Sequence, residues 1–439
     1  MSLFNNLLEN LVIEPWLGCS RMVTARTLEG RLRRLVVTRQ YVPDPNSMLY
    51  VAASALPYHV SGYTTRTHEV VRALGMAGAK VHPMSRPGYP ADRQDRLCDA
   101  TASETNVGDV RYQHASAPAN NRPVLFYAAQ AAQSVANLAR QHKVAVIHAA
   151  SNHVNALPAL LAARALGIPF QYEMRGLWEL TRISRMPKFE TGQGFKQGLQ
   201  LEGLVARHAD RLFVISEQLG RYAQNRWDVS AERMFLLPNC VTPDRFAVTD
   251  HSAIEACSIG YAGSLIGYEG LDTLIEAVHL LAQQRVWVKV TIIGDGEARQ
   301  ALEAQVLQLG LTDRIAFLGK MPPDAARAAL GACALVCIPR KPFKVCEIVP
   351  PIKMVEAMAM GKPVIVPDLP VFRDELGENP TGWFFRAGDS SDLALAIEKA
   401  FSDQGALQEM GLQARAYAVA QRSWEKFVIN AVPGRKNEV

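Results

Sequence analysis

The stretch SIGYAGSLIGYEGLDTLIEAVHLLAQQRVWVKVTIIGDG, residues 258–296, decides the fold class of this chain. An apolar run at 258–264 ends in a glycine turn, and residues 270–284 then repeat apolar side chains at the spacing of one helix face. A second apolar run follows at 286–296. A strand, a helix and a strand in this order predict a βαβ unit with parallel strands, whose sheet is covered by helices on both faces.

The same alternation of strand and helix patterns extends over most of the chain. It runs from Met48 to about residue 246 and again from Ser258 to about residue 410. Between these regions, residues 244–257 break the apolar pattern and predict a linker. We therefore predict an α/β protein with two tandem, Rossmann-like doubly wound domains, which span 48–246 and 258–410.

The two ends of the chain lie outside this alternation. Residues 1–47 contain an apolar, helix-like stretch and a basic cluster, so we expect a helical extension that packs on the body or lies on an anionic membrane surface. Residues 411–439 continue a helical pattern that is long enough to cross back. We therefore expect this C-terminal helix to pack on the first domain.

Length and composition exclude several classes of protein. The chain has 439 residues, of which 49% are hydrophobic and 20% charged, and this excludes disorder, collagen and a small disulfide scaffold. No run approaches about 20 uncharged apolar residues, and Glu9 and Glu14 interrupt the first apolar stretch, so we expect neither a membrane span nor a signal peptide. Seven irregularly spaced cysteines fit a reducing cytoplasm, and we expect Cys333 and Cys337 to be core thiols and not metal ligands.

The net charge of +5 is distributed unevenly along the chain. Residues 1–256 hold 28 Lys and Arg against 21 Asp and Glu, whereas residues 257–439 hold 19 against 21. A basic first half favours an anionic partner, such as the inner face of a membrane, and the alternative is a solvated surface without a partner. No dense basic stripe or known motif indicates a nucleic acid.

The segment EIVPPIKMVEAMAMGKPVIVPD, residues 347–368, has the clearest chemical pattern. A loop with two prolines leads into a helix, whose free N–H groups and positive dipole end suit a phosphate. Lys353 adds a full positive charge near that helix start, and Glu356, about one turn later, could accept hydrogen bonds from sugar hydroxyls. The alternative is an ordinary surface helix with a solvated lysine and glutamate.

This segment resembles the donor-site signature of retaining family 4 glycosyltransferases, which have the GT-B-type fold. Other segments that resemble the family follow in the family's order; they are SALPYHVSGYTTRTHEVVRAL (54–74), HAASNHVNALPALLAARALGIPFQYEMRGLWE (148–179), GYAGSLIGYEGLDTLIEA (260–277), IIGDGEAR (292–299) and FLGKMP (317–322). The resemblance covers about residues 48–400. It implies two domains that face each other across a cleft, with the acceptor on the first and the sugar nucleotide on the second.

The resemblance also implies roles for single residues. Glu356 matches the glutamate that holds the donor ribose, and Glu347 resembles an earlier glutamate that faces the donor sugar, although eight residues lie between them here and the family usually has seven. The other donor-binding positions contact the diphosphate or the base, or lie at the cleft edge; they are Gly62, Gly294, Lys320, Met321, Ile352 and Lys353.

Two phosphate-binding cations of the family are missing from this chain. The usual arginine and lysine of the first donor-domain loop are Ser264 and Glu269 here, in a YEGLD variant that resembles a subgroup of the family. We expect the compensating positive charge to come from Arg340, Lys353 and Arg175. For Arg175, the alternative is a structural ion pair with Glu173 or Glu179.

A family histidine near the reacting sugar is also missing. The usual His-x-His reads His148-Ala149-Ala150, so the second histidine is absent. His148 and His153 are the candidates to approach the reacting sugar, with His59 as a third. Each of them could instead be a hydrogen-bonded core residue.

The resemblance implies a hexosyl transfer with retention, from a UDP- or GDP-type sugar to a glycan or lipid-linked acceptor in cell-surface polysaccharide or glycolipid assembly. We expect a cytoplasmic enzyme, peripheral at the inner membrane face, that needs no cofactor. No Asp-x-Asp motif stands in the expected loops, so we also expect no metal requirement. Two alternatives remain open, which are a sugar-nucleotide 2-epimerase on the same fold and a catalytically silent protein that binds sugar nucleotides.

Overall fold

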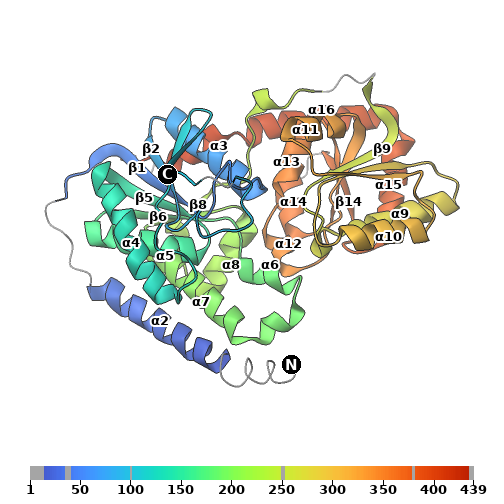
Figure 1. Ribbon diagram of the computed structural model, residues 1–439. Coiled ribbons are helices and arrows are strands. Elements are labelled where there is room, and N and C mark those ends of the chain that lie inside the picture. The colour runs from blue at the N-terminus through green and yellow to red at the C-terminus, as the bar shows by residue number, and fades with distance from the viewer. Residues whose placement is uncertain (1–13, 35–40, 99–100, 249–252, 378–380, 435–439) are drawn as a thin grey trace. The chain divides into compact units, whose positions relative to one another are not determined.

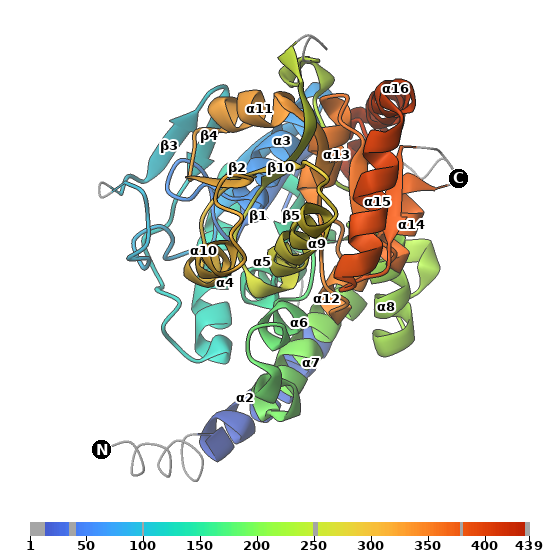
Figure 2. The ribbon, with the colours of Figure 1, turned by 90° about the vertical axis from the view of Figure 1, so that its right-hand side faces the viewer.

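The computed structural model describes residues 14–34, 41–98, 101–248, 253–377 and 381–434 (Figure 1). These residues divide into two compact units, each with its own sheet. Unit 1 contains the residues up to Ile215, Leu219–Leu237 and those from Phe427, whereas unit 2 contains Ser216–Gln218 and Pro238–Lys426. Figures 1 and 2 show the strands of each unit enclosed between helices, so the two doubly wound α/β domains predicted from the sequence are confirmed.

The sheet of unit 1 has eight strands in the order β3-β4-β2-β1-β5-β6-β7-β8. Neighbouring strands are parallel, except that β3 and β4 form an antiparallel edge. The strands are β1 (Asp44–Ala52), β2 (Lys80–Ser85), β3 (Glu104–Val107), β4 (Val110–Gln113), β5 (Val144–Ala150), β6 (Phe170–Met174), β7 (Arg211–Val214) and β8 (Met234–Leu236). The strand order reverses between β1 and β5, so their carboxyl ends form the switch point at which such sheets bind ligands.

The helices that cover this sheet are α3 (Gly62–Met76), α4 (Val124–Gln141), α5 (His153–Leu166), α6 (Trp178–Ile183), α7 (Gln193–His208) and α8 (Glu217–Trp227). Helix α5 starts at the switch point, where the Asn152 side chain accepts the Val154 N–H, and it ends at Gly167 in a left-handed conformation. Helix α5 is largely buried and packs on α4 and α7. This burial fixes the position of its first residue, His153.

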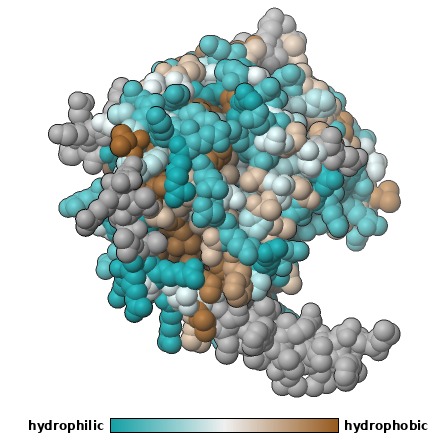
Figure 3. Space-filling view, turned by 60° about the vertical axis from the view of Figure 1, so that its left-hand side comes forward, coloured by the Kyte–Doolittle hydropathy of each residue, from teal (hydrophilic) through white to brown (hydrophobic). Residues whose placement is uncertain are grey.

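The N-terminal segment contains helix α2 (Glu14–Arg34), which packs on α7 and α4 of unit 1. Ala25 and Leu28 are buried in this contact, whereas Met22 and Val23 are exposed. The part of the predicted extension at residues 1–13 lies outside the described residues. Figure 3 shows a largely hydrophilic face on which hydrophobic side chains occupy a smaller area. Among the described residues, no helix combines the length and hydrophobicity needed to cross a bilayer.

The sheet of unit 2 has six parallel strands in the order β11-β10-β9-β12-β13-β14. The strands are β9 (Glu255–Ala262), β10 (Lys289–Ile293), β11 (Ile315–Gly319), β12 (Cys333–Cys337), β13 (Val364–Pro367) and β14 (Gly382–Phe385). The first strand, β9, lies between β10 and β12, so the switch point of unit 2 is at the carboxyl ends of β9 and β12. Cys333 and Cys337 of β12 are buried, as expected of core thiols.

The helices of unit 2 are α9 (Leu271–Gln283), α10 (Arg299–Gln308), α11 (Pro323–Gly331), α12 (Lys344–Ile348), α13 (Ile352–Ala359), α14 (Pro370–Leu376), α15 (Ser390–Ser402) and α16 (Gln404–Gln421), and the short helix α17 (Trp424–Val428) spans the boundary between the units. The structure differs from the prediction for residues 411–439. Helix α16 packs on α13 and belongs to unit 2, because Gly411 lies against the backbone of Gly361. The return to unit 1 begins only at Phe427.

Candidate functional site

The switch point of unit 2 is formed by backbone segments in close contact. Gly263 follows β9 and Gly294 follows β10, and a Cβ atom at Gly294 would lie 1.8 Å from the Gly263 carbonyl oxygen. A Cβ atom at Gly263 would lie 2.5 Å from Lys353 Nζ. Larger residues are therefore excluded at both positions, and the Lys353 ammonium group lies directly over the end of β9.

A buried glutamate holds two cations beside this end. Lys353 Nζ donates to Glu269 Oε2 at 2.8 Å and to the Tyr261 hydroxyl at 2.8 Å. Arg340 Nη2 donates to Glu269 Oε1 at 2.9 Å, and Arg340 Nη1 donates to the Val349 carbonyl oxygen at 2.9 Å. The loops after β9 and β12 and the start of α13 thus meet in one cluster with two positive charges and one negative charge.

Burial acts on each charge of this cluster, and the neighbouring charges oppose it. Burial alone would raise the pKa of Glu269, which is 3% exposed, but Arg340 and Lys353 lower it to about 2. Burial lowers the pKa of Lys353, and Glu269 partly offsets this effect. Glu269 stands where the family usually has a phosphate-binding lysine. Its negative charge keeps two other cations, Arg340 and Lys353, charged and in place.

Helix α13 begins at Ile352 and presents Lys353 and Glu356 one turn apart on the same side. Met354 and Val355 of the same helix are buried and fix it on the sheet, whereas Glu356 is half-buried. The first turn offers free N–H groups next to the Lys353 charge. That this combination binds a phosphate group stays a prediction from the sequence.

The remaining residues predicted for the donor site lie at different distances from this cluster. Glu347 belongs to α12 and pairs with Lys344 Nζ at 2.7 Å. Ser264 is exposed and its carbonyl oxygen accepts the Tyr261 hydroxyl. Lys320 and Met321 follow β11, which lies two strands from β9 at the edge of the sheet. The structure groups Gly263, Lys353 and Arg340, and it leaves Glu347 in a local surface pair.

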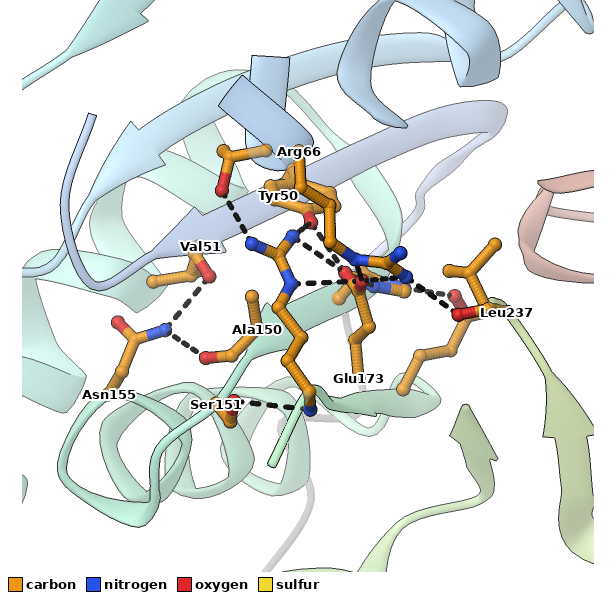
Figure 4. Close-up of polar contacts among 12 residues, drawn as sticks. Tyr50, Val51, Arg66, Ala150, Ser151, Asn155, Glu173 and Leu237 are labelled. Carbon is orange, nitrogen blue, oxygen red and sulfur yellow. Dashed lines mark hydrogen bonds and ion pairs between the residues drawn. The ribbon is translucent and has the colours of Figure 1, made fainter. Parts of the chain in front are cut away.

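Unit 1 has its own glutamate between two cations (Figure 4). Glu173 Oε1 accepts from Arg66 Nη2 at 2.9 Å and from Arg175 Nε at 2.9 Å, and the Tyr50 hydroxyl donates to Glu173 Oε2 at 2.6 Å. Arg175 also donates to the Tyr63 carbonyl oxygen, at 3.0 Å. Arg175 thus forms the structural ion pair with Glu173 that was the alternative interpretation.

The two arginines set the charge state of this glutamate. Burial would raise the pKa of Glu173, but Arg175 and Arg66 hold it well below its ordinary value. His148 completes the network, with 2.9 Å between its Nδ1 and Gln171 Oε1, 3.4 Å between its Nε2 and Glu173 Oε2, and its ring stacked on Tyr50. The His148 side chain is completely buried, as in the core interpretation.

His153 belongs to a second buried cluster in unit 1. Its Nδ1 lies 3.0 Å from Glu202 Oε1 and 3.7 Å from Glu179 Oε1. The Tyr172 hydroxyl donates to Glu202 Oε2 at 2.5 Å. Burial and the neighbouring Glu202 raise the pKa of Glu179 to about 7, and His153 opposes this rise.

Two further predicted residues lie near the carboxyl end of β1. Gly62 is the exposed first residue of α3, directly after the capping residue Ser61. His59 Nδ1 lies 2.7 Å from the Tyr89 hydroxyl, and its Nε2 lies 3.3 Å from Asp95 Oδ1. His59 is therefore held by residues of the segment that follows β2.

The sequence did not indicate a role for Arg66, Tyr50 or Glu202. It also did not predict that Glu269 pairs with Arg340 and Lys353. Arg66 and Glu202 are charged residues inside helices whose other buried residues are mostly apolar, in TTRTHEVV and GLQLEGLV. A charged residue on the apolar face of an amphipathic helix could have identified both residues. Such a charge is buried on folding and needs a hydrogen-bond or ion-pair partner.

Two family models match the chain, one for each unit. The model described as "Glycosyl transferase 4-like domain" matches residues 61–240, and the model described as "Glycosyl transferases group 1" matches residues 256–417. A phosphatidyl-myo-inositol mannosyltransferase of Mycobacterium leprae is 33% identical over 156 residues, which are 36% of this chain and 40% of that protein. A 2-deoxystreptamine glucosyltransferase of Streptomyces kanamyceticus is 24% identical over 257 residues, which are 55% of this chain and 64% of that protein. The matches thus span about half the length of these curated relatives.

Solved structures resemble the chain over a larger part of its length. Sucrose-phosphate synthase from Thermosynechococcus elongatus has a TM-score of 0.72 at 16% identity, over 88% of this chain and 97% of that chain. Anabaena Alr3699/HepE in complex with UDP has a TM-score of 0.64 at 18% identity, with the same two coverages. At these identities the likeness concerns the fold.

Proposed function

We propose that this chain, whose two units each match a glycosyltransferase family model and whose fold is of the GT-B type, transfers a hexose from a nucleoside diphosphate sugar to an acceptor hydroxyl, with retention. The observation that carries the proposal is the cluster of Lys353, Arg340 and Glu269 at the start of α13. It lies at the switch point of unit 2, where doubly wound sheets bind nucleotides.

The chemistry of the cluster suits a departing diphosphate. When the bond to the sugar breaks, negative charge develops on the leaving oxygen, and cations fixed beforehand stabilise that charge without reorganisation. Lys353 retains 14% of its side-chain exposure, so an incoming phosphate can reach it. Arg340 Nε has no hydrogen-bond partner in the described structure, so this arginine has a donor left.

Glu356 completes the donor site in this proposal. It follows Lys353 by one turn and would accept hydrogen bonds from the donor ribose. Alr3699/HepE has been solved with UDP and with UDP-glucose, and this supports a donor of the UDP type as the first to be tested, with GDP as the second.

On the acceptor side, we propose that Arg175 and His148 act as positioning residues. Their polar atoms are bound within unit 1, and they fix the carboxyl ends of β5 and β6. The basic excess of residues 1–256 supports an anionic acceptor, such as a lipid-linked diphospho-sugar, and a peripheral contact with an anionic membrane. Binding to anionic vesicles that falls with added salt is the expected result, whereas equal binding to neutral vesicles would argue against it.

The central experiment measures thermal unfolding with UDP, GDP, UDP-glucose and inorganic phosphate. A ligand that binds the folded chain raises its Tm, and we expect this rise with a nucleoside diphosphate and its sugar. In Glu356→Ala the rise should disappear and most of the transfer activity should be lost, while the circular dichroism stays that of the wild type. Near-normal transfer by Glu356→Ala would refute the donor-site assignment.

Incubation with the sugar nucleotide alone distinguishes the competing activities. A 2-epimerase converts the donor into its epimer without an acceptor, whereas the proposed enzyme leaves it intact until an acceptor is added. A protein that binds the donor but shows no turnover with any acceptor would be the silent binding protein.

A further inference from the structure

The cluster of His153, Glu179 and Glu202 in unit 1 contains two buried carboxylates and a single histidine. Glu179 is 1% exposed and Glu202 is fully buried. Within the described ranges, no lysine or arginine pairs with either carboxylate, in contrast to Glu173 and Glu269. Two carboxylates buried together are costly, and His153 can supply at most one of the two compensating positive charges, so a further cation would stabilise the arrangement.

The two carboxylates differ in how they are satisfied. Glu202 Oε1 accepts the backbone N–H of His153 at 2.6 Å, and Glu202 Oε2 accepts the Tyr172 hydroxyl. Among the described residues, neither oxygen of Glu179 has a hydrogen-bond partner, although both are buried. Glu179 is therefore a buried acceptor without a hydrogen bond, and His153 Nδ1 lies 3.7 Å from its Oε1.

The backbone of α7 is shaped around this carboxylate. A Cβ atom at Gly198 would lie 2.2 Å from Glu179 Oε1 and 2.6 Å from its Cγ, so a larger residue there would displace the Glu179 side chain. Gly198 and Glu202 are four residues apart, on one face of the helix. Helices α5, α6 and α7 thus each place one part of the cluster and hold it in fixed geometry.

We propose that His153, Glu179 and Glu202 bind one divalent transition-metal ion, of the Zn²⁺ or Mn²⁺ type. The ligand atoms of the three residues all lie within 4.8 Å of one another, and they form the one such group of His, Cys, Asp or Glu in the part of the chain that the structure describes. Ligands about 2.1 Å from an ion in tetrahedral geometry lie about 3.4 Å apart, and the two measured distances from His153 Nδ1, 3.0 and 3.7 Å, lie on either side of this value.

The donor set also selects the kind of ion. One imidazole nitrogen with two carboxylates suits Zn²⁺ or Mn²⁺, whereas Mg²⁺ and Ca²⁺ prefer oxygen ligands alone. Tyr172 would orient the ligating Glu202, as hydrogen-bonded neighbours do in known metal sites. His153 retains 9% of its side-chain exposure, which gives the ion a path from solvent. The ion would fix the start of α5.

The test measures metal binding directly, so it does not depend on the proposed transfer activity. The full chain, stripped with a chelator, is titrated with Zn²⁺, Mn²⁺ and Mg²⁺ and followed by calorimetry and thermal unfolding. We expect one Zn²⁺ or Mn²⁺ per chain, a rise in Tm with that ion, and no rise with Mg²⁺. Metal binding should release protons, because the ligands must be deprotonated.

Variants separate the site from adventitious surface binding. Glu179→Gln has the same size and should weaken binding at least about tenfold while the circular dichroism is unchanged. Glu375→Gln is the matched control, because Glu375 is also buried but pairs with Arg422, and it should bind the ion as the wild type does. If the wild type binds neither ion, or if Glu179→Gln binds as tightly as the wild type, the proposal is overturned and the carboxylates share a proton instead.

Discussion

The clusters around Glu173 in unit 1 and Glu269 in unit 2 contain the same charges. They differ in how many N–H groups of their cations have hydrogen-bond partners. Each has one buried glutamate between two cations. In unit 1, the Nε, Nη1 and Nη2 atoms of Arg175 all donate to partners of the same unit. In unit 2, the buried Arg340 Nε has no hydrogen-bond partner among the residues that the structure describes, and Lys353 is partly exposed. The comparison indicates that a complete cluster stabilises the fold, whereas an incomplete one is left with donors for a ligand.

The largest effect on stability should come from Glu173→Gln. This change leaves Arg66 and Arg175 buried without their carboxylate, and breaking such an ion pair costs about 3–5 kcal/mol. Urea unfolding of the variant measures the loss, with the exposed Glu232→Gln of the same unit as the control. A loss below about 1 kcal/mol would show that the unit 1 cluster is not structural.

Lys353→Ala should act on function more than on stability. Removing one preorganised cation from a developing negative charge lowers kcat/KM by about 10²–10³-fold. Steady-state kinetics with the donor identified by thermal shift gives this ratio, and the exposed Lys289→Ala, which loses only a surface pair with Glu255, should stay near the wild type. Unchanged kinetics in Lys353→Ala would mean that the open cluster does not face the donor.

The unit 2 cluster should lower the free energy of unfolding as the pH becomes acidic. The pKa of Glu269 is about 2, below the ordinary value of about 4.3, so its ionised form stabilises the fold. The stabilisation is complete above pH about 4.3 and is lost as the pH falls toward 2. The difference in unfolding free energy between the wild type and Glu269→Gln should shrink over this window. A difference that stays constant with pH would contradict the assigned charge state.

The smallest effects should come from the two tyrosines whose hydroxyl groups form hydrogen bonds within the clusters. Tyr50→Phe removes a hydroxyl that donates to Glu173, and Tyr261→Phe removes one that accepts from Lys353. A hydrogen bond to a charged group contributes about 1.5–3 kcal/mol. We expect Tyr50→Phe to lower the unfolding free energy without changing nucleotide affinity, and Tyr261→Phe to weaken nucleotide binding in calorimetry. The reverse pattern would assign the ligand to unit 1.

The sequence predicted the two sheets because their signal is local. Alternating apolar runs and helical spacing are readable within about 40 residues, as in 258–296. The C-terminal boundary was harder to predict, because the same helical pattern suits packing on either unit. Contacts that are distant in sequence, such as that of Gly411 with Gly361, show that α16 stays with unit 2.

The polar sites were less predictable because their partners are distant in sequence. Glu269 pairs with residues 71 and 84 positions away, so the sequence showed a missing phosphate cation but not the ion pairs that replace it. His148 stood at a strand end, which does not reveal that its ring stacks on Tyr50 of the neighbouring strand. The roles of these residues in catalysis stay predictions until the variants are measured.

The order of the units along the chain affects how the protein could be re-engineered. Unit 1 is interrupted after Leu237 and resumes at Phe427, where Arg211 donates to the Asn430 carbonyl oxygen. A fragment cut after the linker would therefore lack part of its own domain. Unit 2, in contrast, is nearly one uninterrupted insertion, so residues 238–426 can be exchanged with those of a relative as a single segment, and the donor choice of such a chimera would test whether unit 2 binds the donor.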